Sequence, residues 1–366
     1  MLFLTRYPEL GASSRYRVYQ YLPYLGDYGI SWQVQSFMDE RLYSMTFQPG
    51  RPFSKAWYSF LSLMRRVRAV ARHRHFDVVY MQRELLPFGP PLLERWMKLR
   101  GTPLIFDIDD ALFIKKPSRF NPLATLLRSP RKTLQLFQLV DHVVTGNSWL
   151  AERAMEAGGR ATPIEVAEQT ERFDTRIQSK RASESPVIGW LGSSSTAKYL
   201  ELIAPVLRRI ARRYPNARFV AVGSGSFEMA GVPWEIRAWS LEEETRSLNE
   251  FDIGLMPLPD EDWALGKSGG KARTYMAAGV VPVCAGIGYN RQLIEHGRTG
   301  FLCTRLAEWY QTLRFLLESP QQRLETGMAA QSEVRRRFQP RDKAKEIARL
   351  VREVADRSAS VGRVAR

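Results

Sequence analysis

Two lysines flank a glycine pair in the stretch Lys267-Ser-Gly-Gly-Lys271, which precedes a helical and then a strand-like pattern. A helix that begins at Gly269 and Gly270 presents free backbone N–H groups and the positive end of its dipole, and both suit a phosphate group. Lys267 and Lys271 would add charge-assisted hydrogen bonds to a diphosphate. The alternative is an ordinary crossover in which the glycines only make a turn. We favour a phosphate site, because the lysines and the downstream pattern agree.

A second loop of this kind, Gly192-Ser-Ser-Ser-Thr-Ala-Lys198, follows a strand-like run. Gly192, Ser193 and Thr196 can cap the next helix or donate hydrogen bonds to a phosphate. Lys198 falls in the first helical turn, where a cation is unfavourable unless an anion lies nearby. We therefore expect this loop to contribute to the same site, with simple helix capping as the alternative.

The run from Lys271 to Val283, KARTYMAAGVVPV, resembles the donor-binding helix of GT-B glycosyltransferases, specifically of the retaining glycosyltransferase family 4. The resemblance continues through residues 294–302 and 187–192. It implies an α/β fold of GT-B architecture, with two Rossmann-like parallel-sheet domains facing a cleft and a C-terminal helix that crosses back to the first domain. It also implies transfer of a sugar from a nucleotide sugar, with retention of configuration and without a metal.

The resemblance assigns further donor-binding roles in the second half. Gly223 would approach the nucleotide, and Trp239 would stack on the base, although burial between helices is the alternative. Two glutamates of the family are replaced here by Gly266 and Thr274. Thr274 could hydrogen-bond a ribose hydroxyl, less strongly than a carboxylate would.

In the first half, the loop after the first strand resembles the family's loop near the donor phosphates and the acceptor. It places Ser14, Arg15 and Arg17 on the acceptor or phosphate side. The strand end Asp107-Ile-Asp-Asp110 provides Asp109, which we group with Lys271 and Lys198 as catalytic candidates.

Two alternatives concern these aspartates. Asp107 and Asp109 also match the Asp-x-Asp motif that binds a divalent cation in GT-A enzymes, but that interpretation requires a chain with one Rossmann-like half. The other alternative is a structural network of Asp109 with Arg83 or Arg119.

Strand and helix patterns alternate along the chain, which predicts parallel sheets whose ligands bind at the carboxyl ends of the strands. We expect an N-terminal acceptor-side domain over 1–178, a linker over 179–186 and a nucleotide-sugar domain over 187–340. A crossover helix over 341–357 and a disordered tail over 358–366 would follow. The expected strands are 1–6, 31–37, 77–81, 103–107, 142–145 and 163–167, then 187–191, 218–222, 251–256, 281–284 and 300–303.

The net charge is +16, and residues 51–135 contain seventeen Lys/Arg against six Asp/Glu. Residues 57–74 mix aromatic and basic side chains at helical spacing, which suits anionic lipid headgroups. RNA binding or a plain solvated face would give the same pattern, but no nucleic-acid motif is present. No apolar run reaches the ~20 residues of a membrane span, so we expect a cytoplasmic protein that is peripheral on the inner membrane face. Cys284 and Cys303 look like packed thiols.

These features predict a nucleotide-sugar-dependent glycosyltransferase that acts on a glycan or a lipid-linked acceptor in cell-envelope polysaccharide or glycolipid synthesis. A GT-B nucleotide-sugar epimerase and a non-catalytic homologue that binds nucleotide sugar or glycan are the alternatives. The sequence does not specify the donor base, the sugar, the acceptor or the oligomeric state.

Overall fold

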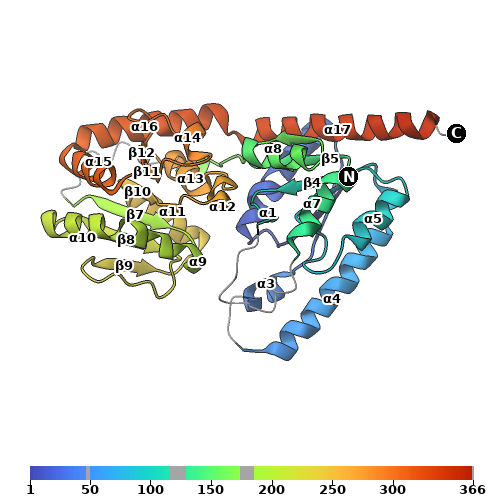
Figure 1. The fold of residues 1–366 in the computed structure, drawn as a ribbon, viewed down its shortest axis with the longest axis horizontal. Helices are drawn as coiled ribbons and strands as arrows, with labels where there is room; N and C mark the ends of the chain where they lie inside the picture. Colours follow the sequence, from blue (N-terminus) through green and yellow to red (C-terminus); the bar gives the residue numbers. More distant parts are fainter. Residues whose placement is uncertain (47–49, 115–128, 174–184, 365–366) are drawn as a thin grey trace. The chain divides into compact units, whose positions relative to one another are not determined.

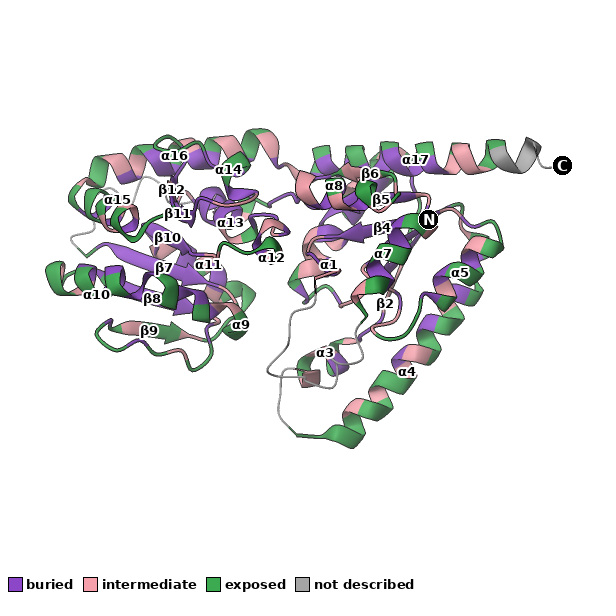
Figure 2. Cartoon of the chain, viewed as in Figure 1, coloured by how far each residue is buried: buried purple, intermediate pink, exposed green. Residues whose placement is uncertain are grey.

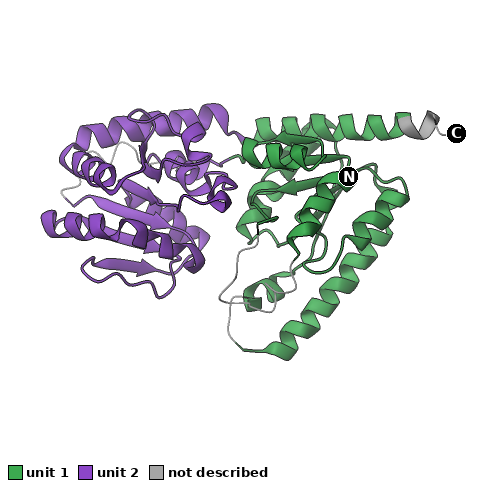
Figure 3. Ribbon diagram, in the orientation of Figure 1, with its two compact units in different colours: residues 1–167, 340–366 green, residues 168–339 purple. Residues whose placement is uncertain are grey.

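The computed structural model describes residues 1–46, 50–114, 129–173 and 185–364. The chain forms two compact units, residues 1–167 with 340–366, and residues 168–339 (Figure 3). Each unit contains a six-stranded parallel sheet with helices packed around it (Figure 1). The predicted α/β fold with two Rossmann-like sheets is therefore confirmed.

The sheet of the first unit has the strand order β2-β1-β3-β4-β5-β6. The order reverses between β1 and β3, and ligands of such sheets bind beyond the carboxyl ends of the strands at the point of reversal. The strands are β1 Leu2–Thr5, β2 Gln33–Ser36, β3 Val79–Gln82, β4 Leu104–Ile108, β5 His142–Thr145 and β6 Ala161–Pro163. Strand β6 ends at Pro163, the residue at which the predicted strand 163–167 begins.

The helices of the first unit include a long, largely exposed α4 beside α5 (Figure 2). Residues 12–28 form a series of short helical turns, one of which, α2, has Pro23 in its first turn, where proline is tolerated. The helices are α1 Ala12–Arg17, α2 Leu22–Leu25, α3 Glu40–Thr46, α4 Pro52–Ala71, α5 Leu92–Leu99, α7 Pro130–Leu139, α8 Ser148–Glu156 and α17 Pro340–Val364, with 3-10 turns η1 Tyr19–Tyr21, η2 Gly26–Tyr28 and η3 His73–His75.

The C-terminal helix α17 belongs to the first unit, as predicted for a crossover helix. Ile347, Leu350, Val351 and Val354 are buried in the core of that unit. Arg341 pairs with Asp27 and Lys343 approaches Glu165 on the same unit. The helix continues to Val364, beyond the predicted end at 357 and into the segment expected to be disordered.

The second unit has the strand order β9-β8-β7-β10-β11-β12, which reverses between β7 and β10. Its strands are β7 Val187–Leu191, β8 Arg218–Val222, β9 Trp234–Arg237, β10 Ile253–Met256, β11 Val281–Ala285 and β12 Phe301–Cys303. Its helices are α9 Ser194–Ala197, α10 Ala204–Arg213, α11 Leu241–Glu250, α12 Asp262–Leu265, α13 Gly270–Ala277, α14 Asn290–Leu293, α15 Leu306–Glu318 and α16 Pro320–Arg337, with 3-10 turns η4 Glu171–Phe173 and η6 Lys198–Ile203.

The unit boundary falls between Ala167 and Glu168, whereas most of the predicted linker, 179–184, lies outside the described residues. Both cysteines are buried thiols, as expected. Among the described residues, no helix is long and apolar enough to span a bilayer.

Candidate functional site in the second unit

Helix α13 is held over the point where the second sheet reverses its strand order. Gly254 of β10 has no Cβ, and an added Cβ would lie 2.5 Å from the Tyr275 ring. The Tyr275 hydroxyl accepts from the Leu191 amide of β7 and donates to the Leu255 carbonyl of β10. A buried ring therefore ties the helix to the two strands that flank the reversal.

The N-terminus of α13 has the backbone that the sequence predicts. Gly269 is the N-cap, with φ +65°, and no side chain caps the helix. The left-handed conformation suits glycine, and a Cβ there would also meet Leu293 and Tyr289. The first turn therefore keeps its N–H groups for a ligand or for water.

Lys271 lies at the centre of this site. Its ammonium is 4.7 Å from the Trp190 ring centroid and 3.3 Å from Thr196 Oγ1. A Cβ on Gly192 would lie 2.7 Å from the Lys271 side chain, so the glycine makes room for the lysine. Burial, with the nearby charge of Lys267, lowers the pKa of Lys271 to about 7. A half-buried cation with one weak hydrogen bond is a suitable partner for an entering anion.

The other two predicted lysines are placed differently. The Lys267 ammonium is 4.0 Å from the Trp263 ring centroid and close enough to Lys271 to depress its pKa. Lys198 is exposed and its ammonium lies 5.5 Å from the Tyr199 ring centroid. Lys267 and Lys271 thus lie near each other. Among the described residues, no contact joins Lys198 to either of them.

Trp239 lies beside the loops that contain Gly192 and Gly223. Gly223 has φ +75°, and its Cα faces the Gly192 carbonyl so closely that an added Cβ would be 2.2 Å from that oxygen and 3.1 Å from Trp239 Cβ. Trp239 is 40% exposed, and its indole N–H donates to Glu244 at 2.7 Å. Ser193 is exposed and bonds to Ser195. The indole is thus fixed at one edge and partly open to a ligand.

A buried ionic network, which the sequence analysis missed, links Trp239 to α13. Glu168 accepts from Thr274 Oγ1 at 2.9 Å, and Arg172 bridges Glu168 and Glu244 at 3.2 and 3.0 Å. Glu168 is only 1% exposed, and burial raises its pKa. Its position directly after a predicted strand was the available signal. Thr274, also buried, bonds to the Gly270 carbonyl as well.

Two candidates in the first unit are structural, contrary to prediction. Arg17 is buried and pairs with Asp107 at 2.7 Å, and it also donates to the Ile164 carbonyl at 2.7 Å. Ser14 is fully buried, donates to Gln82 and accepts from the Tyr7 amide. Neither side chain is available to a substrate. Arg15 is half-buried, with its guanidinium 5.2 Å from the Tyr16 ring centroid.

Asp109 is half-buried at the carboxyl end of β4. Ser13 donates to its Oδ2 at 2.6 Å, and Gln82 in turn donates to Ser13. Asp109 Oδ1 is buried and has no hydrogen-bond partner among the described residues. Asp107 cannot act as a second metal ligand beside it, because Arg17 and Tyr80 occupy the Asp107 carboxylate. Arg119 lies outside the described residues.

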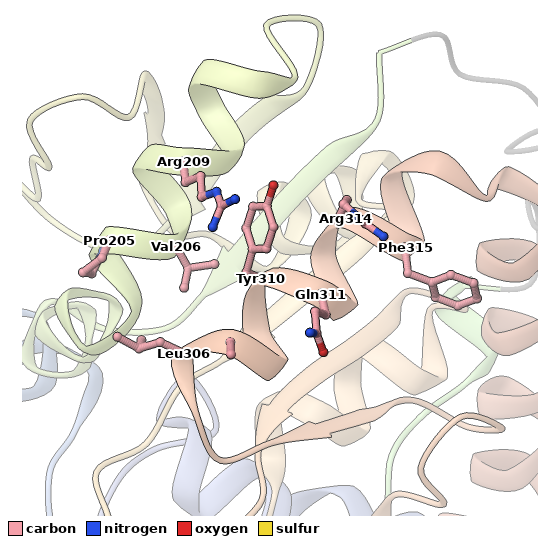
Figure 4. Close-up of a pocket in the computed structure, with 9 residues that line it drawn as sticks. Pro205, Val206, Arg209, Leu306, Tyr310, Gln311, Arg314 and Phe315 are labelled. Carbon is pink, nitrogen blue, oxygen red and sulfur yellow. The ribbon is translucent and has the colours of Figure 1, made fainter.

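A surface groove of about 730 Å³ lies elsewhere, between α10 and α15 (Figure 4). Arg209 stacks over the Tyr310 ring there, 3.9 Å from its centroid. None of the residues that line this groove is a predicted donor-site residue.

Comparison with known proteins agrees with this architecture. The family model for glycosyl transferases group 1 matches residues 185–319. No curated protein matches the chain in sequence.

Solved structures resemble nearly the whole chain at low identity. Alr3699/HepE of Anabaena, solved with UDP and glucose, is 16% identical with a TM-score of 0.68, over 96% of this chain and 99% of that one. A glycosyltransferase of Rickettsia africae is 13% identical, with a TM-score of 0.67 and coverage of 96% and 98%. Sucrose-phosphate synthase of Thermosynechococcus elongatus is also 13% identical, with a TM-score of 0.65 and the same coverage. Residues 185–319 of the second unit thus match the family model for glycosyl transferases group 1, and the chain as a whole has the GT-B fold of these solved structures.

Proposed function

We propose that this protein is a glycosyltransferase that takes its sugar from a nucleoside diphosphate sugar bound in the second unit and transfers it with retention. The main support is the half-buried Lys271 ammonium beside the uncapped N-terminus of α13 at the strand reversal. Alr3699/HepE has been solved with UDP and with UDP-glucose, so a uridine donor is the first to test.

The leaving nucleoside diphosphate gains negative charge as the glycosidic bond breaks. The Gly269–Lys271 backbone amides and the two ammonium groups would stabilise that charge, and a group aimed at developing charge lowers the barrier to reaction. In the first unit, Asp109 would accept a hydrogen bond from a hydroxyl of the acceptor through Oδ1, which has no hydrogen-bond partner among the described residues.

The test is a panel of UDP-, GDP- and ADP-sugars, with release of nucleoside diphosphate and the anomeric configuration of the product measured together. Release with retention is the expected outcome. Binding without turnover would favour the non-catalytic alternative, and conversion of the free nucleotide sugar would favour the epimerase. Absence of binding by every nucleotide would contradict the proposal.

We further propose that the first unit docks on an anionic membrane and receives a lipid-linked acceptor there. One side of α4 carries exposed apolar residues at successive helical turns, which are Phe53, Trp57, Phe60, Met64 and Val67. Leu92 and Leu99 of α5 are also exposed, at 63% and 87%. Arg68, Arg72 and Arg74 are exposed beside them. Apolar residues flanked by cations fit an anionic headgroup boundary.

Co-sedimentation with vesicles tests this surface. Arg68→Gln/Arg72→Gln should weaken binding to phosphatidylserine vesicles about thirtyfold, since each cation near the surface contributes ~1 kcal/mol. Arg66 is unsuitable for this purpose because it is buried, and Arg65 pairs with Asp39. Arg212→Gln/Lys345→Gln removes two exposed charges elsewhere and should leave binding unchanged. Equal binding to neutral vesicles would contradict the proposal.

A further inference from the structure

Three arginines gather where the first sheet reverses its strand order. Arg6 directly follows β1 and Arg83 directly follows β3, the two strands that flank the reversal. Arg66 reaches the same end of the sheet from α4 and donates to the Thr5 carbonyl, the last residue of β1. The guanidinium carbons of Arg6 and Arg66 lie 5.2 and 5.8 Å from one Phe37 ring centroid.

Several nitrogen donors of this cluster are buried without a hydrogen-bond partner among the described residues, although carboxylates lie near Arg83. Arg66 is 1% exposed, and its Nε and Nη1 have no hydrogen-bond partner among the described residues. Arg83 Nε likewise has none, and the Arg83–Asp110 pair is loose at 3.9 Å. Unsatisfied buried donors on a charged group are costly, so an anion that accepts from them would stabilise the unit.

Burial lowers the pKa values of two of these arginines, whereas the pKa of Arg83 is raised, against the effect of burial, by Tyr7, Asp109, Asp110 and Glu84. Burial, with the charge of Arg6, lowers the pKa of Arg66 to about 9. Burial also lowers the pKa of Arg6, an effect that Tyr7 opposes and the charge of Arg83 strengthens. The phenol of Tyr7 lies 3.4 Å from Arg83 Nη1, and although burial raises its pKa, Arg83 and Arg6 lower it overall.

The backbone of Arg83 supports a functional role. Its φ is +67°, a left-handed conformation that a non-glycine residue adopts at an energetic cost. Such conformations concentrate at ligand sites, where the surrounding structure holds the side chain in place. The Arg83 side chain is 18% exposed, and Arg6 and Tyr7 are half-buried, so a ligand can reach them.

We propose that Arg6, Arg66 and Arg83 form, with Tyr7, a binding site for a phosphate or diphosphate group of the acceptor. Arg6 and Arg83 would contact the phosphate oxygens, and Arg66 would add its charge from the buried side. Arg66 lies on α4, the helix whose outer side carries the exposed apolar stripe. A lipid diphosphate could thus keep its chain in the membrane while its headgroup binds the arginines. This inference rests on the proposed transferase function.

A matched ligand pair tests the site. Binding of farnesyl diphosphate and of farnesol to the full-length protein should differ about tenfold or more in favour of the diphosphate, because charge-assisted hydrogen bonds are the strong ones. Arg83→Gln should abolish that preference, Arg83→Lys should restore part of it, and Arg100→Gln, an exposed arginine of the same unit, should not affect it. Arg6→Gln gives a second, independent loss if Arg83→Gln folds poorly.

UDP binding shows whether the arginine site binds the phosphate of the acceptor or that of the nucleotide. Arg83→Gln should leave UDP affinity unchanged, whereas Lys271→Ala should lose it and keep the diphosphate preference. Equal affinity of the wild type for farnesol and farnesyl diphosphate would overturn the inference, and so would loss of UDP affinity in Arg83→Gln. If the wild type binds no nucleoside diphosphate at all, the proposed transferase function fails, whatever the farnesyl ligands show.

Discussion

The two units place cations at the strand reversal of their sheets in different ways. In the second unit, Lys271 is packed against Trp190 with one weak hydrogen bond, and burial lowers its pKa to about 7. In the first unit, Arg17 is locked to Asp107, while Arg66 is buried with two unsatisfied nitrogens. A lysine can lose its proton when no anion is bound, but an arginine keeps its charge far more readily.

This difference suggests different behaviour toward ligands. Because the pKa of Lys271 is about 7, this lysine can be partly uncharged at neutral pH until a diphosphate arrives, which suits a ligand that enters and leaves in each cycle. The arginines of the first unit hold a more permanent positive charge, which suits an anchor for one part of a substrate. The predictions below test each side of this comparison, beginning with the largest effect.

Removal of the Lys271 ammonium should have the largest effect. Lys271→Ala should weaken nucleoside diphosphate binding tenfold or more, because a charge-assisted hydrogen bond to a partly buried phosphate contributes ~1.5–3 kcal/mol. Calorimetric titration with UDP, GDP and ADP measures the change. Lys198→Ala is the matched control, since Lys198 is exposed and should affect binding less. Unchanged affinity in a folded Lys271→Ala protein would remove the central role of this lysine.

The pH dependence of binding should separate a lysine from an arginine. Below pH 7 Lys271 is charged in the free protein, and above pH 7 it must take up a proton to pair with a phosphate. Affinity should therefore fall as pH rises from 7 to 9, by up to about tenfold per pH unit. Lys271→Arg should bind with little dependence on pH in this range. Titrations in buffers of different ionisation enthalpy would show proton uptake for the wild type alone, and equal slopes for both proteins would argue against this assignment.

The glycine loops, most strands other than β6 and β9, and the C-terminal helix face were predictable because each depends on local pattern. Gly269 and Gly270 open a helix after polar residues, and the apolar positions of α17 repeat at helical spacing. The buried arginines were not predictable in this way. Arg17 pairs with a residue ninety positions along the chain, and Arg66 is one of several arginines in a basic helix, so only tertiary packing shows which of them turns inward.

Glu168 illustrates the same limit within the donor site. Its partner Thr274 is 106 positions away, so spacing could not join them. The family pattern showed a missing carboxylate at 274, and the structure has a buried carboxylate hydrogen-bonded to that residue. A contact of this kind depends on where two loops meet at the end of a sheet, which sequence periodicity does not encode.

We expect Glu168→Gln to weaken nucleoside diphosphate binding about threefold to tenfold while changing pyrophosphate binding little. The substitution removes the charge that holds Arg172 between Glu168 and Glu244, and so loosens Trp239 relative to α13. A positioning effect of ~1 kcal/mol is smaller than loss of a direct phosphate contact. Glu242→Gln, an exposed carboxylate on α11, provides the control. An equal loss for pyrophosphate and nucleoside diphosphate would mean that Glu168 supports the phosphate site itself.

The smallest expected effect is that of a chelator. Asp107 and Asp109 are the carboxylates that could bind a cation between them, but Asp107 is fully buried and both its oxygens are engaged by Arg17 and Tyr80. Among the described residues, no group of three His, Cys, Asp or Glu side chains is arranged to hold a metal ion. Lys271 and the α13 amides can stabilise the leaving diphosphate instead. Transfer rates measured with and without EDTA should therefore agree within error. Inactivation by EDTA with recovery on addition of Mn²⁺ would show that a cation also stabilises the leaving diphosphate. It would favour a metal site at the first-unit carboxylates Asp107 and Asp109.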